Sequence, residues 1–196
     1  MDFDYYPFDE KDIRIVLCDT KVHHSLASSE YNVRRRQCED GVSTLKKFDE
    51  SIQSLRDVSL DFLRSRIKSL DEIVYKRCEF VIEENDRLLE ACVNLQNQDL
   101  KSFGEKMYQS HFGLRDKYEV SCAELDFLVE LTSDFEGIFG SRMMGGGFGG
   151  CTINLIQVDA IDDFTLSVSK EYEKKFGKRP EFYITQIVGG TSFIHD

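Results

Sequence analysis

The chain has 196 residues, of which 41% are hydrophobic and 31% are charged, and its formal net charge is -11. This length favours one compact domain, residues 1–196, and the apolar content is enough for a buried core. The acidic charge argues against nucleic acid as a partner, and no apolar run reaches the length of a membrane span, so we expect no membrane partner either.

The first predicted element is a strand at residues 13–18, a short β-branched run that is typical of a buried strand. A helix is then expected to begin near Ser28 or Ser29, since either side chain can cap it. This start places Tyr31 in the first turn of the helix. The apolar face of the helix contains Cys38, Val42 and Leu45.

The middle of the chain is predicted to be mostly helical. Ser69 and Glu72 have the spacing of a capping box, and apolar residues between positions 74 and 95 then recur every three or four residues. This pattern indicates a long helix that faces the core. A further helix is expected over residues 100–107, where Leu, Phe and Met share one face.

Helices give way to alternating elements toward the end of the chain. Another capping box, at Ser121 and Glu124, predicts a short helix over residues 125–129. The remaining elements are a strand at residues 152–158, a helix with apolar residues from Ile161 to Tyr172, and a strand at residues 181–188.

This order of elements favours an α+β architecture in which helices pack on one side of a small, mostly antiparallel sheet. Only three strands are strongly predicted. Residues 2–7 are the best candidate for a fourth strand, because the aromatic side chains of Phe3, Tyr5 and Tyr6 favour extended structure. Neither a proline nor a low-complexity linker marks a domain boundary inside the chain.

The six cysteines lie far apart and form no CxxC pair. Cys18, Cys78 and Cys92 fall within apolar patterns, so we interpret them as reduced core residues. The first residues have neither the basic region nor the apolar core of a signal peptide. Both observations lead us to expect a cytoplasmic protein.

The most informative segment is rich in glycine and has five glycines among the six positions 145–150. Such a loop can adopt positive φ and bring its backbone N–H groups close to an anion or to a second loop. Gly145, Gly147 and Gly150 fit the GxGxxG pattern, but a strand follows where a dinucleotide site needs a helix. The lysine of a P-loop is also missing. Two interpretations of this segment remain open: a loop that takes part in phosphate chemistry, and a flexible surface hairpin.

Two polar clusters are candidates for chemistry, although neither supplies the base, cations and metal ligands of a complete phosphotransferase. For the arginines of the first cluster the simpler interpretation is a solvated face, since at least one of three consecutive arginines must face solvent. For the second cluster it is an interhelical salt-bridge network that holds the turn before Ser121. The first cluster contains Asp19, His23, His24, Glu30, Tyr31, Arg34, Arg35 and Arg36, and the second contains His111, Arg115, Asp116 and Glu119.

Three blocks of sequence resemble the galactokinases, which belong to the GHMP-type small-molecule kinases. The first block, residues 22–39, includes Tyr31 and the three consecutive arginines. The second block is residues 110–126, and the third is the glycine-rich segment 141–152, which resembles the third motif of GHMP-type kinases. The blocks follow in the order of the family. The resemblance therefore indicates the C-terminal half of a galactokinase.

This resemblance implies the α+β fold of the GHMP kinase C-terminal domain, a small, mostly antiparallel four-stranded sheet with helices packed on it. It also implies that Tyr31 hydrogen-bonds galactose and that the glycine loop supports the sugar and phosphate site. The loop residues are Gly145, Gly146, Gly147, Phe148, Gly149 and Gly150. We expect no catalytic residue and no metal ligand within this chain.

The resemblance further implies an N-terminal half that carries the sugar signature, the ATP loop, and the catalytic aspartate and arginine. ATP and Mg²⁺ are then the cofactors, bound mainly by that half. Galactose is the expected substrate, phosphorylated at its C1 hydroxyl to galactose 1-phosphate. This chain alone is expected to be inactive.

Two other functions are compatible with the same resemblance. Galactokinase-like proteins also serve as non-catalytic sugar and nucleotide sensors that bind a regulatory partner, and a related kinase acts on N-acetylgalactosamine. The features that separate these functions lie outside this chain. Without its other half, the chain is expected to expose an apolar patch around the glycine loop and Tyr31, which favours self-association or instability.

Overall fold

The computed structural model describes residues 6, 8, 10–22 and 27–187, except for the side chains of residues 27–29. Its strands are β1 (Ile13–Asp19), β2 (Ile138–Met143), β3 (Cys151–Gln157) and β4 (Glu181–Thr185). Its α-helices are α1 (Ala27–Leu45), α2 (Leu60–Ser65), α3 (Glu72–Gln96), α4 (Leu100–Asp116), α5 (Ala123–Glu130) and α6 (Ile161–Phe176). Short 3₁₀ turns occupy Leu55–Asp57, Ile67–Ser69 and Val158–Ala160.

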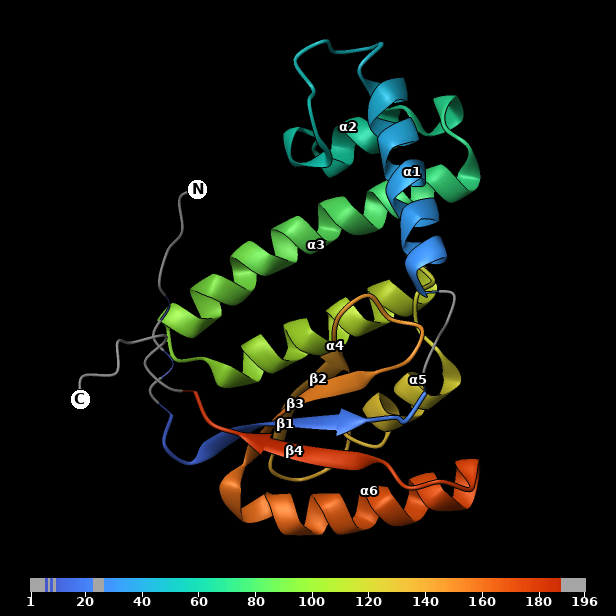
Figure 1. Ribbon diagram of the computed structural model, residues 1–196. Coiled ribbons are helices and arrows are strands. Elements are labelled where there is room, and N and C mark those ends of the chain that lie inside the picture. Colours follow the sequence, from blue (N-terminus) through green and yellow to red (C-terminus); the bar gives the residue numbers. More distant parts are fainter. Residues whose placement is uncertain (1–5, 7, 9, 23–26, 188–196) are drawn as a thin grey trace, which may run out of the picture.

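The four strands form one antiparallel sheet in the order β2-β3-β1-β4. The α+β class and the four-stranded antiparallel sheet are therefore confirmed. Figure 1 shows α6 along one side of the sheet, with α3 and α4 on the other and α1 and α2 beyond α3.

Helices cover both faces of the sheet, so the expectation of helices on one side is wrong. Val16 and Cys18 on β1 pack against α5 and α6, whereas Ile13, on the opposite face of the same strand, packs in a cluster with Met107 of α4. Successive residues of a strand point to opposite faces. Because β1 is apolar on both faces, each face needs its own cover.

The fourth strand of the described sheet is β2, which was not among the predicted strands. Residues 2–5 and 7 lie outside the described residues, and Tyr6 is not in a strand. The sequence of β2, Ile-Phe-Gly-Ser-Arg-Met, is weak in β-formers. It includes Gly140 because α4 approaches there: a Cβ on Gly140 would lie 2.5 Å from the Cα of Gly104.

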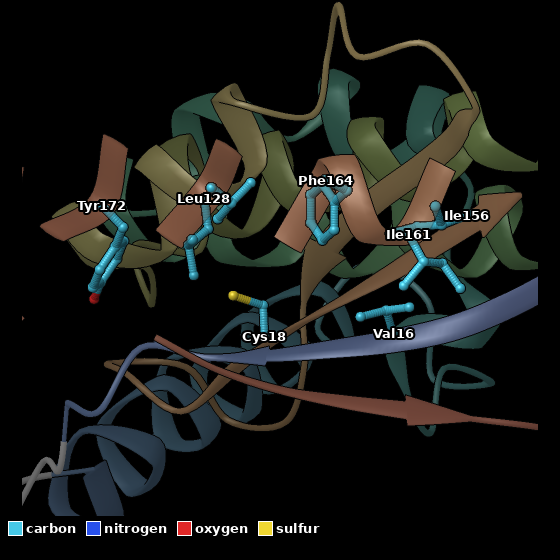
Figure 2. Packing of buried hydrophobic residues seen from close by; sticks show 8 residues of the cluster. Val16, Cys18, Leu128, Ile156, Ile161, Phe164 and Tyr172 are labelled. Carbon is cyan, nitrogen blue, oxygen red and sulfur yellow. The ribbon is translucent and has the colours of Figure 1, made fainter. Parts of the chain in front are cut away.

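The core between the sheet and helices α5 and α6 is predominantly apolar. Figure 2 shows Phe164, Ile161 and Leu128 directed toward Val16 and Cys18 of β1. Tyr172 is also fully buried, and its hydroxyl donates to the Thr20 carbonyl at 2.8 Å. This bond satisfies the only polar group of a large buried ring.

A second core joins α1, α2 and α3. Leu45 is fully buried there, and Cys38 and Val42 pack against the same cluster. The predicted apolar face of the first helix is therefore confirmed. All six cysteines are free, with Cys18 and Cys78 buried and Cys92 half-buried.

Both predicted capping boxes are wrong by one or two residues. Ser69 lies in a 3₁₀ turn, and Asp71 caps α3 by accepting from the Ile73 N–H at 2.9 Å. At α5 the capping position is Cys122, without a side-chain cap, and the Ser121 hydroxyl donates to the Asp126 carboxylate instead. More than one residue before a helix can occupy the capping position, and the backbone of the preceding turn determines which one does.

Candidate functional site

The glycine-rich residues 144–150 form the loop of a β-hairpin that connects β2 to β3. Met143 is paired with Thr152, and the Met144 N–H donates to the Cys151 carbonyl at 2.9 Å. Most of the loop has left-handed backbone: φ is 78° at Gly145, 84° at Gly147, 59° at Phe148, 134° at Gly149 and 78° at Gly150. Glycine adopts such angles readily, which explains the composition of the loop.

The second half of the loop is attached to neighbouring segments of the chain. The Phe148 N–H donates to the Val120 carbonyl at 2.7 Å, and the backbone there is so close that a Cβ on Gly147 would lie 2.0 Å from the same oxygen. The Gly150 carbonyl accepts both the N–H and the hydroxyl of Thr20, at 2.9 and 2.7 Å. The loop is thus held against two other parts of the chain.

The first part of the loop, in contrast, faces open space. A Cβ on Gly145 or Gly146 would meet no atom within 4 Å, and both residues are exposed. A backbone that is fixed at its far end and open at its near end can present N–H groups to a ligand or to a second loop. The backbone of Gly145 and Gly146 is therefore accessible from outside this chain.

Tyr31 lies on α1, and its side chain is exposed, with 58% of its surface accessible. Tyr31 and Tyr118 line one open cavity of about 780 Å³ between α1 and α3. One helical turn further along α1, Arg34 is buried and donates to the Tyr118 carbonyl at 2.7 Å, and its guanidinium lies 6.0 Å from the centre of the Phe148 ring. Arg34 therefore connects the helix of Tyr31 with the glycine loop.

Three further members of the first polar cluster form ion pairs, and Arg36 is exposed. Asp19 contacts Lys21 at 3.2 Å, Glu30 contacts Arg34 at 3.2 Å, and Arg35 contacts Glu39 at 2.8 Å. Arg35 is exposed, so the expectation that at least one of the three arginines faces solvent is confirmed. His23 and His24 lie outside the described residues.

The second polar cluster is an interhelical network, as the simpler interpretation held, but it has separate parts. Arg115 contacts Asp116 at 2.7 Å and Glu130 of α5 at 3.8 Å. Glu119 instead pairs with the buried Arg77 of α3, at 2.7 Å. These contacts hold the end of α4 between its two neighbouring helices.

His111 has a role that the sequence interpretation missed. The side chain is completely buried, its Nδ1 accepts from the Met143 N–H at 3.2 Å, and its Nε2 lies 3.3 Å from Asp126 Oδ1. Met143 is the last residue before the glycine-rich loop. The spacing of His111 from Met107 and Leu114, which share the buried face of α4, was the available signal.

The Asp126 carboxyl is ionised more readily than an exposed aspartate. Burial by itself raises its pKa, but hydrogen bonds from His111 and Ser121 outweigh burial and bring the pKa below the ordinary value of 3.8. A lowered folded-state pKa stabilises the fold above the unfolded value, and this stabilisation disappears as the pH falls through the folded value.

We therefore expect Asp126→Asn to lower the free energy of unfolding by about 1 kcal/mol at pH 7, the net value of a hydrogen bond, and to lose less further stability below pH 3.8 than the parent. Urea titrations between pH 7 and pH 2.5 measure both quantities. Asp40→Asn, at an exposed position of α1, is the control. Equal acid sensitivity of the parent and Asp126→Asn would contradict the assignment.

Within the described part of the chain, no group of three or more His, Cys, Asp or Glu side chains is arranged to hold a metal ion. The same residues contain no helix that is long and apolar enough to cross a membrane. The described side chains around the glycine loop thus offer no such group of ligands for Mg²⁺.

The chain is similar to a known domain family and to known proteins. Residues 88–174 match the family model of the GHMP kinases C terminal domain. Galactokinase from Clostridium acetobutylicum is 38% identical over 197 residues, which cover 100% of this chain and 50% of that protein. The chain thus has a GHMP kinase C-terminal domain. Galactokinase from Streptococcus thermophilus is 42% identical over 193 residues, or 96% of this chain and 49% of that protein.

A solved galactokinase structure has the same fold. Lactococcus lactis galactokinase, crystallised in complex with galactose, superposes with a TM-score of 0.87 and 33% identity over 93% of this chain and 47% of that one. The chain thus spans about half the length of the relatives that it matches, and it corresponds to their C-terminal half.

Proposed function

We propose that this chain forms one domain, residues 1–196, of a galactokinase that transfers the γ-phosphoryl group of ATP to the C1 hydroxyl of galactose. The observation that supports this most is the glycine loop, which is attached at its far end to the segment that also binds the helix of Tyr31. The similarity to galactokinases along the whole chain points to the same substrate.

Tyr31 is proposed as the sugar contact. Its phenol is exposed, and a phenol can donate one hydrogen bond to a sugar hydroxyl and accept another. Residues 145–150 are proposed to shape the adjoining sugar and phosphate site through their backbone. Neither role moves a proton or a phosphoryl group, so the catalytic aspartate and arginine are assigned to the N-terminal half.

ATP and Mg²⁺ are proposed to bind mainly to that half as well. Where ATP and Mg²⁺ are bound, the metal neutralises charge on the phosphates that react. The described residues of this chain offer backbone N–H groups at Gly145 and Gly146 and no cluster of metal ligands. The six free cysteines are consistent with a reducing compartment, and we propose the cytoplasm.

The test is ATP-dependent phosphorylation of galactose by this chain alone and by the chain mixed with a separately produced N-terminal half of the Clostridium acetobutylicum galactokinase. Activity in the mixture and none in either half supports the proposal. Activity of the chain alone would contradict the assignment of catalysis to the other half. A folded mixture that binds galactose and does not phosphorylate it would favour a sensor.

Tyr31→Phe is expected to raise the galactose KM of the reconstituted enzyme about 5- to 10-fold with little change in the KM for ATP, because one hydrogen bond of about 1 kcal/mol is lost. Initial rates at varied galactose and fixed ATP measure this. Tyr75→Phe is the control, since its hydroxyl bonds Glu79 within α3. A galactose KM unchanged by Tyr31→Phe would remove Tyr31 from the site.

The isolated chain is also predicted to self-associate through the surface that the other half would cover. Tyr31, Val33 and Met144 expose 58%, 41% and 42% of their surface. Exposed apolar side chains near one loop are typical of an interaction surface. Size-exclusion chromatography should show species larger than 22.7 kDa that bind a hydrophobic dye, and the N-terminal half should remove both effects. A strictly monomeric chain that binds no dye would contradict this.

A further inference from the structure

Four consecutive carbonyl groups, those of residues 117–120, accept hydrogen bonds from three different parts of the chain. Lys117 O accepts from Arg77 of α3, and Tyr118 O and Glu119 O accept from Nε and Nη2 of Arg34, at 2.7 and 2.8 Å. Val120 O accepts from the N–H of Phe148 in the glycine loop at 2.7 Å. We call residues 117–120 the carbonyl segment.

The shape of the carbonyl segment is set by its backbone. The N–H groups of Lys117 and Tyr118 both donate to Gly113 O at 3.0 Å, which ends α4. Glu119 then has φ of 55°, a left-handed value that is uncommon for a residue with a side chain. This reversal turns successive carbonyls outward, toward α1 and toward the glycine loop.

Arg34 binds two of the four carbonyl groups of the carbonyl segment. Its side chain is only 10% exposed, and one carboxylate, that of Glu30, lies near its Nη1. The cation is therefore held largely by two backbone oxygens and by the nearby Phe148 ring, 6.0 Å away. A buried charge requires such partners, so the carbonyl segment and Arg34 fix each other.

We propose that Arg34 is a positioning residue for the sugar site, acting through the carbonyl segment on the glycine loop and through α1 on Tyr31. Tyr31 precedes Arg34 by one helical turn, and the loop bond at Phe148 is one residue beyond the carbonyls that Arg34 binds. A change in the position of Arg34 therefore displaces both Tyr31 and the glycine loop. This inference rests on the proposed function only for the identity of the ligand.

The variant Arg34→Lys separates the effect of hydrogen-bond geometry from the effect of positive charge at this position. The ammonium group keeps the positive charge beside Glu30, but it lacks the planar fork that reaches two neighbouring carbonyls from separate nitrogens. Arg34→Lys is thus expected to fold and to loosen the loop. Arg35→Lys is the matched control, because Arg35 is exposed and pairs with Glu39 on the same helix.

The first measurement is amide hydrogen exchange of this chain by NMR, residue by residue. In Arg34→Lys, exchange at Phe148 is expected to accelerate at least about 10-fold, while exchange at Thr20, whose N–H bonds the Gly150 carbonyl and not the carbonyl segment, stays unchanged. Arg35→Lys should change neither amide. Unchanged exchange at Phe148 in Arg34→Lys overturns the inference, and so does equal acceleration at Phe148 and Thr20, which marks general destabilisation.

The second measurement uses a chimera in which the N-terminal half of the Clostridium acetobutylicum galactokinase is joined to this chain. Arg34→Lys is expected to raise the galactose KM about 10-fold, leaving the KM for ATP within about 2-fold, and Arg35→Lys to change neither. Equal galactose KM values for Arg34→Lys and the parent overturn the positioning role. If the parent chimera phosphorylates no galactose, the proposed function fails, and hydrogen exchange still decides whether Arg34 holds the loop.

Discussion

Gly147→Ala is expected to lower kcat/KM for galactose in the reconstituted enzyme by at least about 100-fold, equivalent to about 2.7 kcal/mol. Alanine at the φ of 84° found there costs about 1 kcal/mol or more. Its Cβ would also lie 2.0 Å from the Val120 carbonyl oxygen, which is backbone and cannot rotate away. The loop must leave the carbonyl segment and lose the hydrogen bond at Phe148. Steady-state rates measure the effect.

The neighbouring glycines supply graded controls for Gly147→Ala. Gly146 has no positive φ and open space around its Cβ position, so Gly146→Ala should retain nearly the parent rate. Gly145 combines a φ of 78° with open space, so Gly145→Ala isolates the backbone strain. A Gly147 variant no worse than the Gly145 variant would show that contact with Val120 does not position the loop.

Gly104→Ala is expected to have the largest effect on stability, a loss of about 3 kcal/mol or more in the free energy of unfolding. A Cβ there would lie 1.8 Å from the Phe139 carbonyl oxygen, since α4 and β2 touch backbone to backbone. Helix propensity alone predicts the opposite sign, a gain of about 1 kcal/mol for alanine in a helix interior. Urea unfolding of the chain therefore distinguishes the two effects by sign.

Gln109→Ala provides the control in the same helix, because its side chain is exposed and it should change stability by less than about 0.5 kcal/mol. A more stable Gly104→Ala variant would mean that α4 does not lie this close to β2.

The elements with strong local patterns were predicted correctly. β1 and β3 are runs of apolar and β-branched residues, and α6 places Ile161, Phe164, Val168 and Tyr172 on one buried face. Such patterns can be identified from the sequence because apolar residues recur with a period that is set by the helix or strand they form. The family resemblance has the same local character, since it rests on contiguous blocks. The capping boxes failed where alternative capping residues stood one or two positions apart.

By itself, the sequence determined the α+β class, most helices, three of the four strands and the resemblance to the galactokinase C-terminal half. The tertiary structure alone decided that Ile138–Met143 is the fourth strand, that His111 bonds Met143, and that Arg34 reaches the carbonyl segment. Each of these depends on two segments that are distant in sequence and meet in space. Gly140 is a poor strand residue until Gly104 lies against it, and no local pattern encodes that encounter.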